Sequence, residues 1–357
     1  MTKHPLIALC LICLIYVLLA YCYDLIKPQW CDEVWQMIPA ANLAFHGFLG
    51  MGDQMTYILP TLDSETHMYW YPPLGHMSLA LWFKLFGYSL LTARLHTIMW
   101  GVVLLLGCYR IASRDFDRVW CSVHIDTTTW KFTQMTRYIL YMPEVGIWAA
   151  LICALDYNFL FSSDARPDIM CAALGVWAIA TRSAWLAAAA MMVHPFGVLY
   201  PIALTCIKRK AEWIPYAIAI GLWGIYILQD PALWWQTTVN QYIVHCVQIA
   251  YSTGPAVYIG FGTGWRLVLL ATYVVCIAFV ALRDRNITWC FFLLVLPAFF
   301  LTRASYYMPH AVPWLALSVA IMMRRYPWLA VILLLECTFA VTSLFPLWNW
   351  NGVFNLR

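Results

Sequence analysis

Long runs of apolar side chains, broken only by short polar segments, constrain this chain more than any other feature. The first run extends from Pro5 to Tyr23, and similar runs recur along the rest of the chain. A helix of about 20 apolar residues crosses a bilayer, whereas a barrel strand alternates apolar with polar residues. Only 11% of the residues are charged, against about 25% in an average soluble domain. The sequence therefore predicts an all-α polytopic membrane protein and excludes a soluble protein, a disordered chain and a nucleic-acid binder.

About eleven apolar segments are candidates for transmembrane helices, and we expect the shorter ones to be tilted, broken or buried among their neighbours. They are residues 5–23, 92–112, 143–162, 168–181, 184–193, 196–207, 212–229, 265–282, 287–302, 311–323 and 326–345. We expect the first segment to be a retained helix rather than a signal peptide, because its flanks lack a convincing small-residue cleavage site.

The distribution of Lys and Arg predicts the orientation of the chain. With the amino terminus in the cytoplasm, most of the 21 basic side chains lie on the cytoplasmic side, as the positive-inside rule requires. This holds only if residues 73–90 do not cross the membrane. We therefore expect them to form a helix that lies in or re-enters the outer interface, a depth that suits Trp70, Tyr71, Trp82 and Tyr88.

The predicted spans and the predicted orientation of their loops divide the chain into five regions. They are a first transmembrane helix (1–23), a first extracytoplasmic loop with juxtamembrane helices (24–91), transmembrane helices 2–7 with a cytoplasmic insert at 114–142 (92–229), a second large extracytoplasmic loop (230–264), and carboxyl-terminal helices with a short outer tail (265–357). Because polar residues gather in the two outer loops, we expect a functional site on the outer face.

Two adjacent carboxylates, Asp32 and Glu33, follow the first span directly. Carboxylates just outside a membrane can act as a general base or bind a cation. An alternative is that one of them caps the helix predicted from Val34 onward, since acidic residues favour helix amino termini. Spacing alone leaves both interpretations open.

Four other outer segments carry polar groups next to predicted spans. Pro72 and Pro73 predict a rigid helix start, after which His76 is either a ligand or an interfacial polar side chain. In the short hairpin at 162–168, Arg166 can form an ion pair with Asp164 or Asp168, or bind an anionic phosphate.

His194 lies between two short apolar runs, where it is either a buried core histidine or part of a site. The segment 303–310 adds Arg303, Tyr306, Tyr307 and His310 at the end of a predicted span. Several separate segments thus present cationic and hydrogen-bonding groups on one predicted face, which indicates a site more strongly than any single segment does.

These segments, in this order, resemble those of the polyprenyl-phosphate-sugar-dependent glycosyltransferases of the GT-C superfold, in particular the protein O-mannosyltransferase and lipid A aminoarabinose transferase group. The resemblance covers about residues 1–210 and extends more loosely to 325. It is carried by Asp32-Glu33, Ala41 to Gly47, Tyr71-Pro72-Pro73-Leu74, Leu85-Phe86-Gly87, Ala93-Arg94-Leu95, Ser163 to Asp168, His194-Pro195, Arg303 and Tyr306-Tyr307.

The resemblance implies an inverting transfer of a sugar from a polyprenyl phosphate to an acceptor hydroxyl on the extracytoplasmic face. It implies that Asp32 is the base, and we assign the donor phosphate to Arg166, Arg303 and His194, the last at a position where relatives often carry lysine. Residues that could bind substrate or a divalent metal ion are Glu33, His76, Asp168, Tyr306 and Tyr307. Some relatives bind such an ion near the first-loop acids, but no spacing here requires one.

The resemblance leaves several properties open. The expected partners are a polyprenyl-phosphate-linked sugar, membrane lipids and an acceptor that is a lipid, a polysaccharide or a protein. The modest size favours a prokaryotic plasma membrane with the site facing outside. The alternatives are a flippase or transporter for lipid-linked sugars, in which repeated halves and midplane polar groups are common, and a non-catalytic scaffold of the cell envelope.

Overall fold

The computed structural model of the chain describes residues 5–29, 31–52, 66–113, 145–251, 264–300 and 305–342. Within these ranges the regular structure is helical and strands are absent. The longer helices are α1 (Pro5–Ile26), α2 (Cys31–Phe45), α3 (Leu74–Phe86), α4 (Leu90–Ile111), α7 (Val145–Leu155), α9 (Asp168–Thr181), α10 (Ala184–Met191), α11 (Leu199–Lys208), α12 (Trp213–Ile227), α13 (Pro231–Tyr251), α15 (Gly264–Ala281), α18 (Val312–Arg325) and α19 (Val331–Thr342). Shorter pieces are α8 (Tyr157–Phe161), α16 (Arg285–Cys290), α17 (Leu296–Phe300) and 3-10 turns at Pro195–Val198, Ser305–His310 and Pro327–Ala330. The insert predicted at 114–142 lies outside the described residues.

Two of the described helices, α1 and α4, are long and apolar enough to cross a membrane. Helix α12 and residues Pro231–Asn240 of α13 qualify together as a third span, but they bend by 104° at their junction. The other apolar helices have 10–17 residues. The all-α prediction is therefore confirmed for the described residues, and its apolar helices are compatible with membrane insertion. The number of about eleven spans stays a prediction.

The outer surfaces of α1 and α12 carry large apolar side chains. Leu6 and Leu18 on α1, and Trp213, Ile214 and Leu222 on α12, are each more than half exposed. Soluble monomers rarely expose contiguous apolar surfaces of this kind. These faces therefore fit contact with lipid.

Two of the predicted spans are interrupted for identifiable reasons. In the segment predicted at 143–162, α7 ends at Leu155, and the Asp156 carboxylate caps α8 by accepting a hydrogen bond of 3.0 Å from the backbone N–H of Phe159. In the segment predicted at 287–302, a π-helical stretch over Phe291–Val295 separates α16 from α17. Capping and π-bulges are local features, so hydropathy alone does not locate them.

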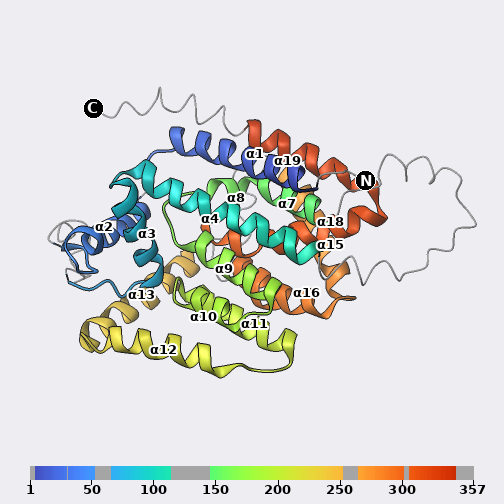
Figure 1. Cartoon of the computed structure of the whole chain (residues 1–357). Coiled ribbons are helices and arrows are strands. Elements are labelled where there is room, and N and C mark those ends of the chain that lie inside the picture. Colours follow the sequence, from blue (N-terminus) through green and yellow to red (C-terminus); the bar gives the residue numbers. More distant parts are fainter. Residues whose placement is uncertain are drawn as a thin grey trace, which may run out of the picture.

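The core consists of helices that approach one another at small residues. Helix α4 packs against α1 and α9, and α7 packs against α18 (Figure 1). Gly101 of α4 faces the Tyr16 ring of α1, and Gly175 of α9 faces the Tyr200 ring of α11. Both tyrosines are fully buried. Small residues at such contacts let apolar helices pack closely without help from the hydrophobic effect.

Helices α2 and α3 pack against each other at one end of the bundle, beside the start of α4 (Figure 1). Helix α3 covers the first part of the interfacial helix predicted at 73–90. It ends at Phe86, and the residue that follows as its cap, Gly87, has a positive φ of 83°. Ser89 then caps α4 by accepting a hydrogen bond from the N–H of Thr92. Most of the region predicted as the second outer loop, 230–264, is helix α13.

The contact between Gly175 and Tyr200 predicts an asymmetric response to added methyl groups. A Cβ at position 175 would lie 2.3 Å from the Tyr200 ring, whereas one at Gly221 of α12 meets nothing within 4 Å. We expect Gly175→Ala to lower the free energy of unfolding by about 1–3 kcal/mol through overpacking. The control Gly221→Ala should leave it unchanged or raise it slightly, since alanine favours helices. Thermal unfolding in detergent micelles, followed by tryptophan fluorescence, measures both; equal melting temperatures would contradict this packing.

Candidate active site

A buried ion pair between Glu33 and Arg94 joins helix α2 to helix α4. Arg94 donates from Nε and Nη2 to the two carboxylate oxygens of Glu33, each at 2.8 Å. Its remaining N–H groups donate to the backbone carbonyls of Asp24, Lys27 and Pro28 at the end of α1. The side chain of Glu33 is completely buried and that of Arg94 nearly so. One guanidinium therefore fixes the end of α1, the first turn of α2 and the second turn of α4 together.

The hairpin between α8 and α9 attaches to the same cluster. The backbone N–H of Ala165 donates to Glu33 at 3.1 Å, and the Ser163 hydroxyl donates to the Asp24 carboxylate at 2.8 Å. Lys27 forms an ion pair of 2.5 Å with Asp164. Burial raises the pKa of the Asp164 carboxyl, and the ammonium of Lys27 partly offsets this effect. These contacts give the hairpin a fixed position against the ends of α1 and α2.

Arg166 connects this cluster to Asp32. Its guanidinium pairs with the Asp32 carboxylate through Nη1, with Asp168 at 3.0 Å through Nε, and with the Tyr71 hydroxyl at 3.3 Å through Nη2. The side chain of Arg166 is 3% exposed, that of Asp168 is 1% exposed and that of Asp32 is 29% exposed. Asp32 is therefore the carboxylate of this group that solvent and a substrate can reach.

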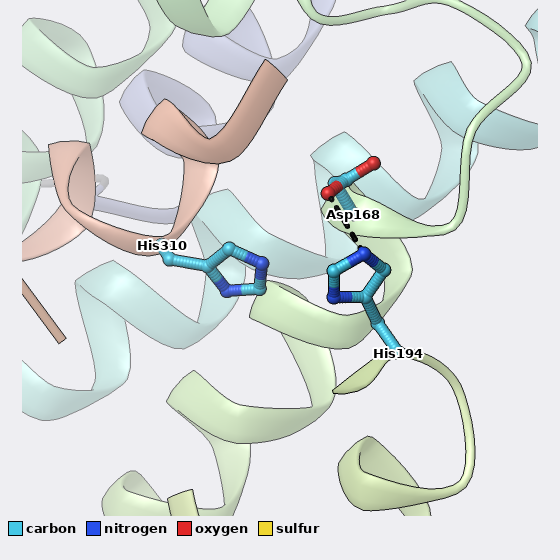
Figure 2. Close-up of side chains that lie close together, drawn as sticks. All are labelled: Asp168, His194 and His310. Atoms are coloured by element: carbon cyan, nitrogen blue, oxygen red, sulfur yellow. Dashed lines mark ion pairs between the residues drawn. The ribbon is translucent and has the colours of Figure 1, made fainter. Parts of the chain in front are cut away.

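Asp168 lies between Arg166 and two histidines. The Nε2 atom of His194 lies 3.6 Å from Oδ1 of Asp168, and the ring of His310 lies beside that of His194, with centroids 6.1 Å apart (Figure 2). Asp168 starts α9, His194 precedes the 3-10 turn at Pro195, and His310 ends the turn before α18. All three residues are at least 97% buried.

The backbone around His194 determines which of its ring nitrogens carries the proton. Nδ1 accepts a hydrogen bond of 3.0 Å from the N–H of Phe196, so in the neutral ring Nε2 is the N–H that faces Asp168. In this orientation His194 offers a hydrogen-bond donor rather than the lone positive charge of a lysine. The predicted role of His194 at a donor phosphate is thereby limited to hydrogen bonding.

His76 is buried in α3, and neither ring nitrogen hydrogen-bonds to another described side chain. Burial lowers its pKa to about 4. Its ring centroid lies 6.3 Å from that of Tyr71, whose hydroxyl contacts Arg166. His76 is thus a neutral group one aromatic ring away from Arg166, and no described carboxylate pairs with it.

The structure brings most of the predicted site residues together. Asp32, Arg166, Asp168 and His194 form one connected group, and the buried Tyr307 ring packs at 5.5 Å from the His194 ring. Glu33 belongs to the neighbouring clamp, where Arg94 and Ala165 occupy both carboxylate oxygens, so the geometry favours a positioning role over substrate or metal binding. Arg303 and the side chain of Tyr306 lie outside the described residues.

Several residues of the cluster have no predicted role in the site. Arg94 is part of the resemblance alone, Tyr71 is predicted besides that as an interfacial aromatic side chain, and no role is predicted for Lys27 or Tyr200. A signal was present for Arg94, because a charged side chain within an apolar helix normally pairs with an opposite charge. The partner could not be read from the sequence, since Glu33 and Arg94 are 61 positions apart.

Comparison with protein-family models, with curated proteins and with solved structures finds no significant similarity to this chain.

The Glu33–Arg94 pair predicts a strong dependence of stability on both partners. Arg94→Met would leave a fully buried carboxylate without its counter-ion, and we expect a loss of about 3–5 kcal/mol in the free energy of unfolding. Adding Glu33→Gln should restore part of it, because the amide removes the charge and can still accept from Ala165. Arg285→Met, at an exposed arginine, is the control. A double variant no more stable than Arg94→Met would contradict the ion-pair account.

The pKa of His76 predicts a loss of stability in acid. Because the folded pKa of about 4 lies below the ordinary 6.5, the unfolded chain binds more protons between these values, and stability falls as the pH drops through this window. A shift of this size amounts to about 3 kcal/mol. We expect His76→Phe to lose less stability than the wild type between pH 7 and pH 4.5, as measured by thermal unfolding. The exposed His46→Phe should follow the wild type; identical pH profiles for all three would refute the assignment.

Proposed function

We propose that this chain is an integral-membrane glycosyltransferase that moves a sugar from a polyprenyl phosphate to an acceptor hydroxyl. The observation that carries the proposal is the position of Asp32. It is a partly exposed carboxylate, held by a buried arginine, in the first turn of α2, the helix that follows the first apolar helix. The ordered set of segments that resembles the GT-C glycosyltransferases supports the same activity. The acceptor class, lipid, polysaccharide or protein, is left open by both.

The two adjacent acids, Asp32 and Glu33, have different proposed roles because their surroundings differ. Glu33 is closed off by Arg94 and holds the loop in place, whereas Asp32 keeps part of its surface accessible. A general base must reach the proton that it removes, within about 2.6–3.2 Å between heavy atoms. Asp32 meets this requirement for an acceptor that approaches from outside, and Glu33 does not.

Arg166 offers a link between donor binding and release of the base. Its guanidinium is shared between Asp32 and Asp168. A phosphate that binds Arg166 would compete with these carboxylates, and the pair with Asp32 is the more exposed of the two. Phosphate binding would therefore free Asp32 to accept a proton at the moment when the donor is present, while Asp168 keeps the guanidinium oriented.

The proposed reaction balances without a general acid. Asp32 takes the proton of the acceptor hydroxyl, the oxygen forms a bond to the anomeric carbon, and the bond from that carbon to the phosphate oxygen breaks. The lipid phosphate leaves with the electron pair, so it needs cationic stabilisation rather than a proton. Arg166 supplies this charge among the described residues, and we assign the same role to Arg303. Attack from the side opposite to the phosphate inverts the anomeric configuration.

The membrane arrangement is part of the proposal. We infer a multi-pass protein of about eleven spans, with the amino terminus in the cytoplasm and the Asp32 cluster on the outer side of a plasma membrane. Support comes from the apolar faces of α1 and α12 and from the bias of Lys and Arg. The donor sugar would then reach the cluster laterally, from the outer leaflet.

Replacement of Asp32 tests the activity. In membranes supplied with a panel of polyprenyl-phosphate sugars, Asp32→Asn should lower transfer at least 100-fold, the lower end of what a general base contributes. Donor binding should be retained or become tighter, since a carboxylate that competes for Arg166 is removed. Asp284→Asn is the matched control, because asparagine preserves its cap on α16.

The possible outcomes separate the three candidate functions. Transfer by Asp32→Asn at the wild-type rate would contradict the assignment of the base. Movement of lipid-linked sugar across vesicles by the wild type, without transfer to any acceptor, would favour the flippase or transporter. Absence of both activities, with retention of a protein complex, would favour the scaffold.

A further inference from the structure

We propose that Asp168, His194 and His310 bind a divalent transition-metal ion of the zinc class, at a site that adjoins the Asp32–Arg166 pair through the contact between Arg166 and Asp168. Metal binding can be measured without the proposed transfer reaction. One carboxylate and two imidazoles form a donor set that suits such ions. One ligand atom from each side chain lies within 4.8 Å of the other two. Coordination at about 2.0–2.2 Å requires side-chain rotations that draw these atoms together by about an ångström.

Two of the three ligand atoms are buried and make no hydrogen bond among the described residues. They are Oδ1 of Asp168 and Nε2 of His310, and Nε2 of His310 turns toward the ring of His194 (Figure 2). Buried polar atoms normally have partners, because an unmet one costs the desolvation of that group. A metal ion coordinated by both atoms would give each of them a partner.

Hydrogen bonds from neighbouring side chains orient two of the proposed ligands, His310 and Asp168. The Tyr200 hydroxyl contacts Nδ1 of His310 at 3.0 Å, and Arg166 donates to the other oxygen of Asp168 at 3.0 Å. Such outer contacts orient metal ligands and settle the histidine tautomer.

His194 has to change its tautomer to coordinate a metal ion. Metal binding through Nε2 moves the ring proton to Nδ1 and ends the hydrogen bond from the N–H of Phe196. One neutral hydrogen bond is worth far less than a metal–imidazole bond, so this loss does not prevent coordination. Metal binding should therefore loosen the 3-10 turn at Pro195–Val198.

A metal ion on Asp168 and the two histidines would join the starts of α9 and α18 to the turn before α11.

Metal binding to the full chain, purified in detergent and stripped with a chelator, tests the site. After dialysis against micromolar Zn²⁺ we expect one zinc ion per chain, and Co²⁺ in its place should give the visible absorption of a low-symmetry nitrogen and oxygen site. His310→Gln should bring bound zinc to background. His96→Gln is the matched control, since His96 is also buried but hydrogen-bonds to Ser78 in another part of the bundle.

Tyr200→Phe provides a second variant that preserves the volume of the core. Loss of an outer-shell hydroxyl typically weakens metal binding by about 10–100-fold, so the Kd for zinc should rise by at least tenfold. Absence of zinc in the wild type would overturn the proposal. So would equal zinc binding by His310→Gln, or an unchanged Kd in Tyr200→Phe if His310→Gln does not fold.

Discussion

The pairing of Arg94 with Glu33 is the interaction on which the polar end of this molecule depends. The chain is 63% hydrophobic. A charge packed between its apolar helices must pair with an opposite charge of the protein, since neither lipid tails nor apolar side chains provide a hydrogen-bond partner or a counter-ion. The Arg94 guanidinium donates hydrogen bonds to both carboxylate oxygens of Glu33 and to three backbone carbonyls at the end of α1. The α8–α9 hairpin then attaches to the same carboxylate through Ala165.

This arrangement explains how neighbouring acids come to have different properties. Asp32 and Glu33 both lie in the first turn of α2, and successive residues of a helix point about 100° apart. Glu33 faces the buried Arg94, while Asp32 faces Arg166 at the edge of the cluster. A fixed clamp next to an accessible carboxylate is what a site with one reactive base requires, because the base must be held in place without being closed off.

The sequence predicted helix positions well and long-range contacts poorly. The helix predicted at 168–181 has the observed bounds, and α1 and α4 lie within a few residues of the predicted spans. Hydropathy and charge suffice for these, because each depends on nearby residues. The break at Asp156 and the π-helical stretch at Phe291–Val295 were missed because capping and bulges depend on backbone geometry.

The sequence predicts the residue types of the candidate site and one of its pairings, the ion pair between Arg166 and Asp168, which are two positions apart. Asp32, Arg166, Asp168 and His194 were chosen as polar residues at helix ends, and they do lie together. Arg166 also pairs with Asp32, and His310 forms a hydrogen bond with Tyr200. Both contacts join helices that are distant in the sequence. No local pattern encodes such contacts.

A cryo-electron microscopy structure of the chain with a bound polyprenyl-phosphate sugar tests the central claim most directly. We expect the phosphate on Arg166, the Asp32 carboxylate released toward the anomeric carbon, and the Glu33–Arg94 pair unchanged. A donor bound away from Arg166, or a Glu33–Arg94 pair broken by its binding, would contradict the account.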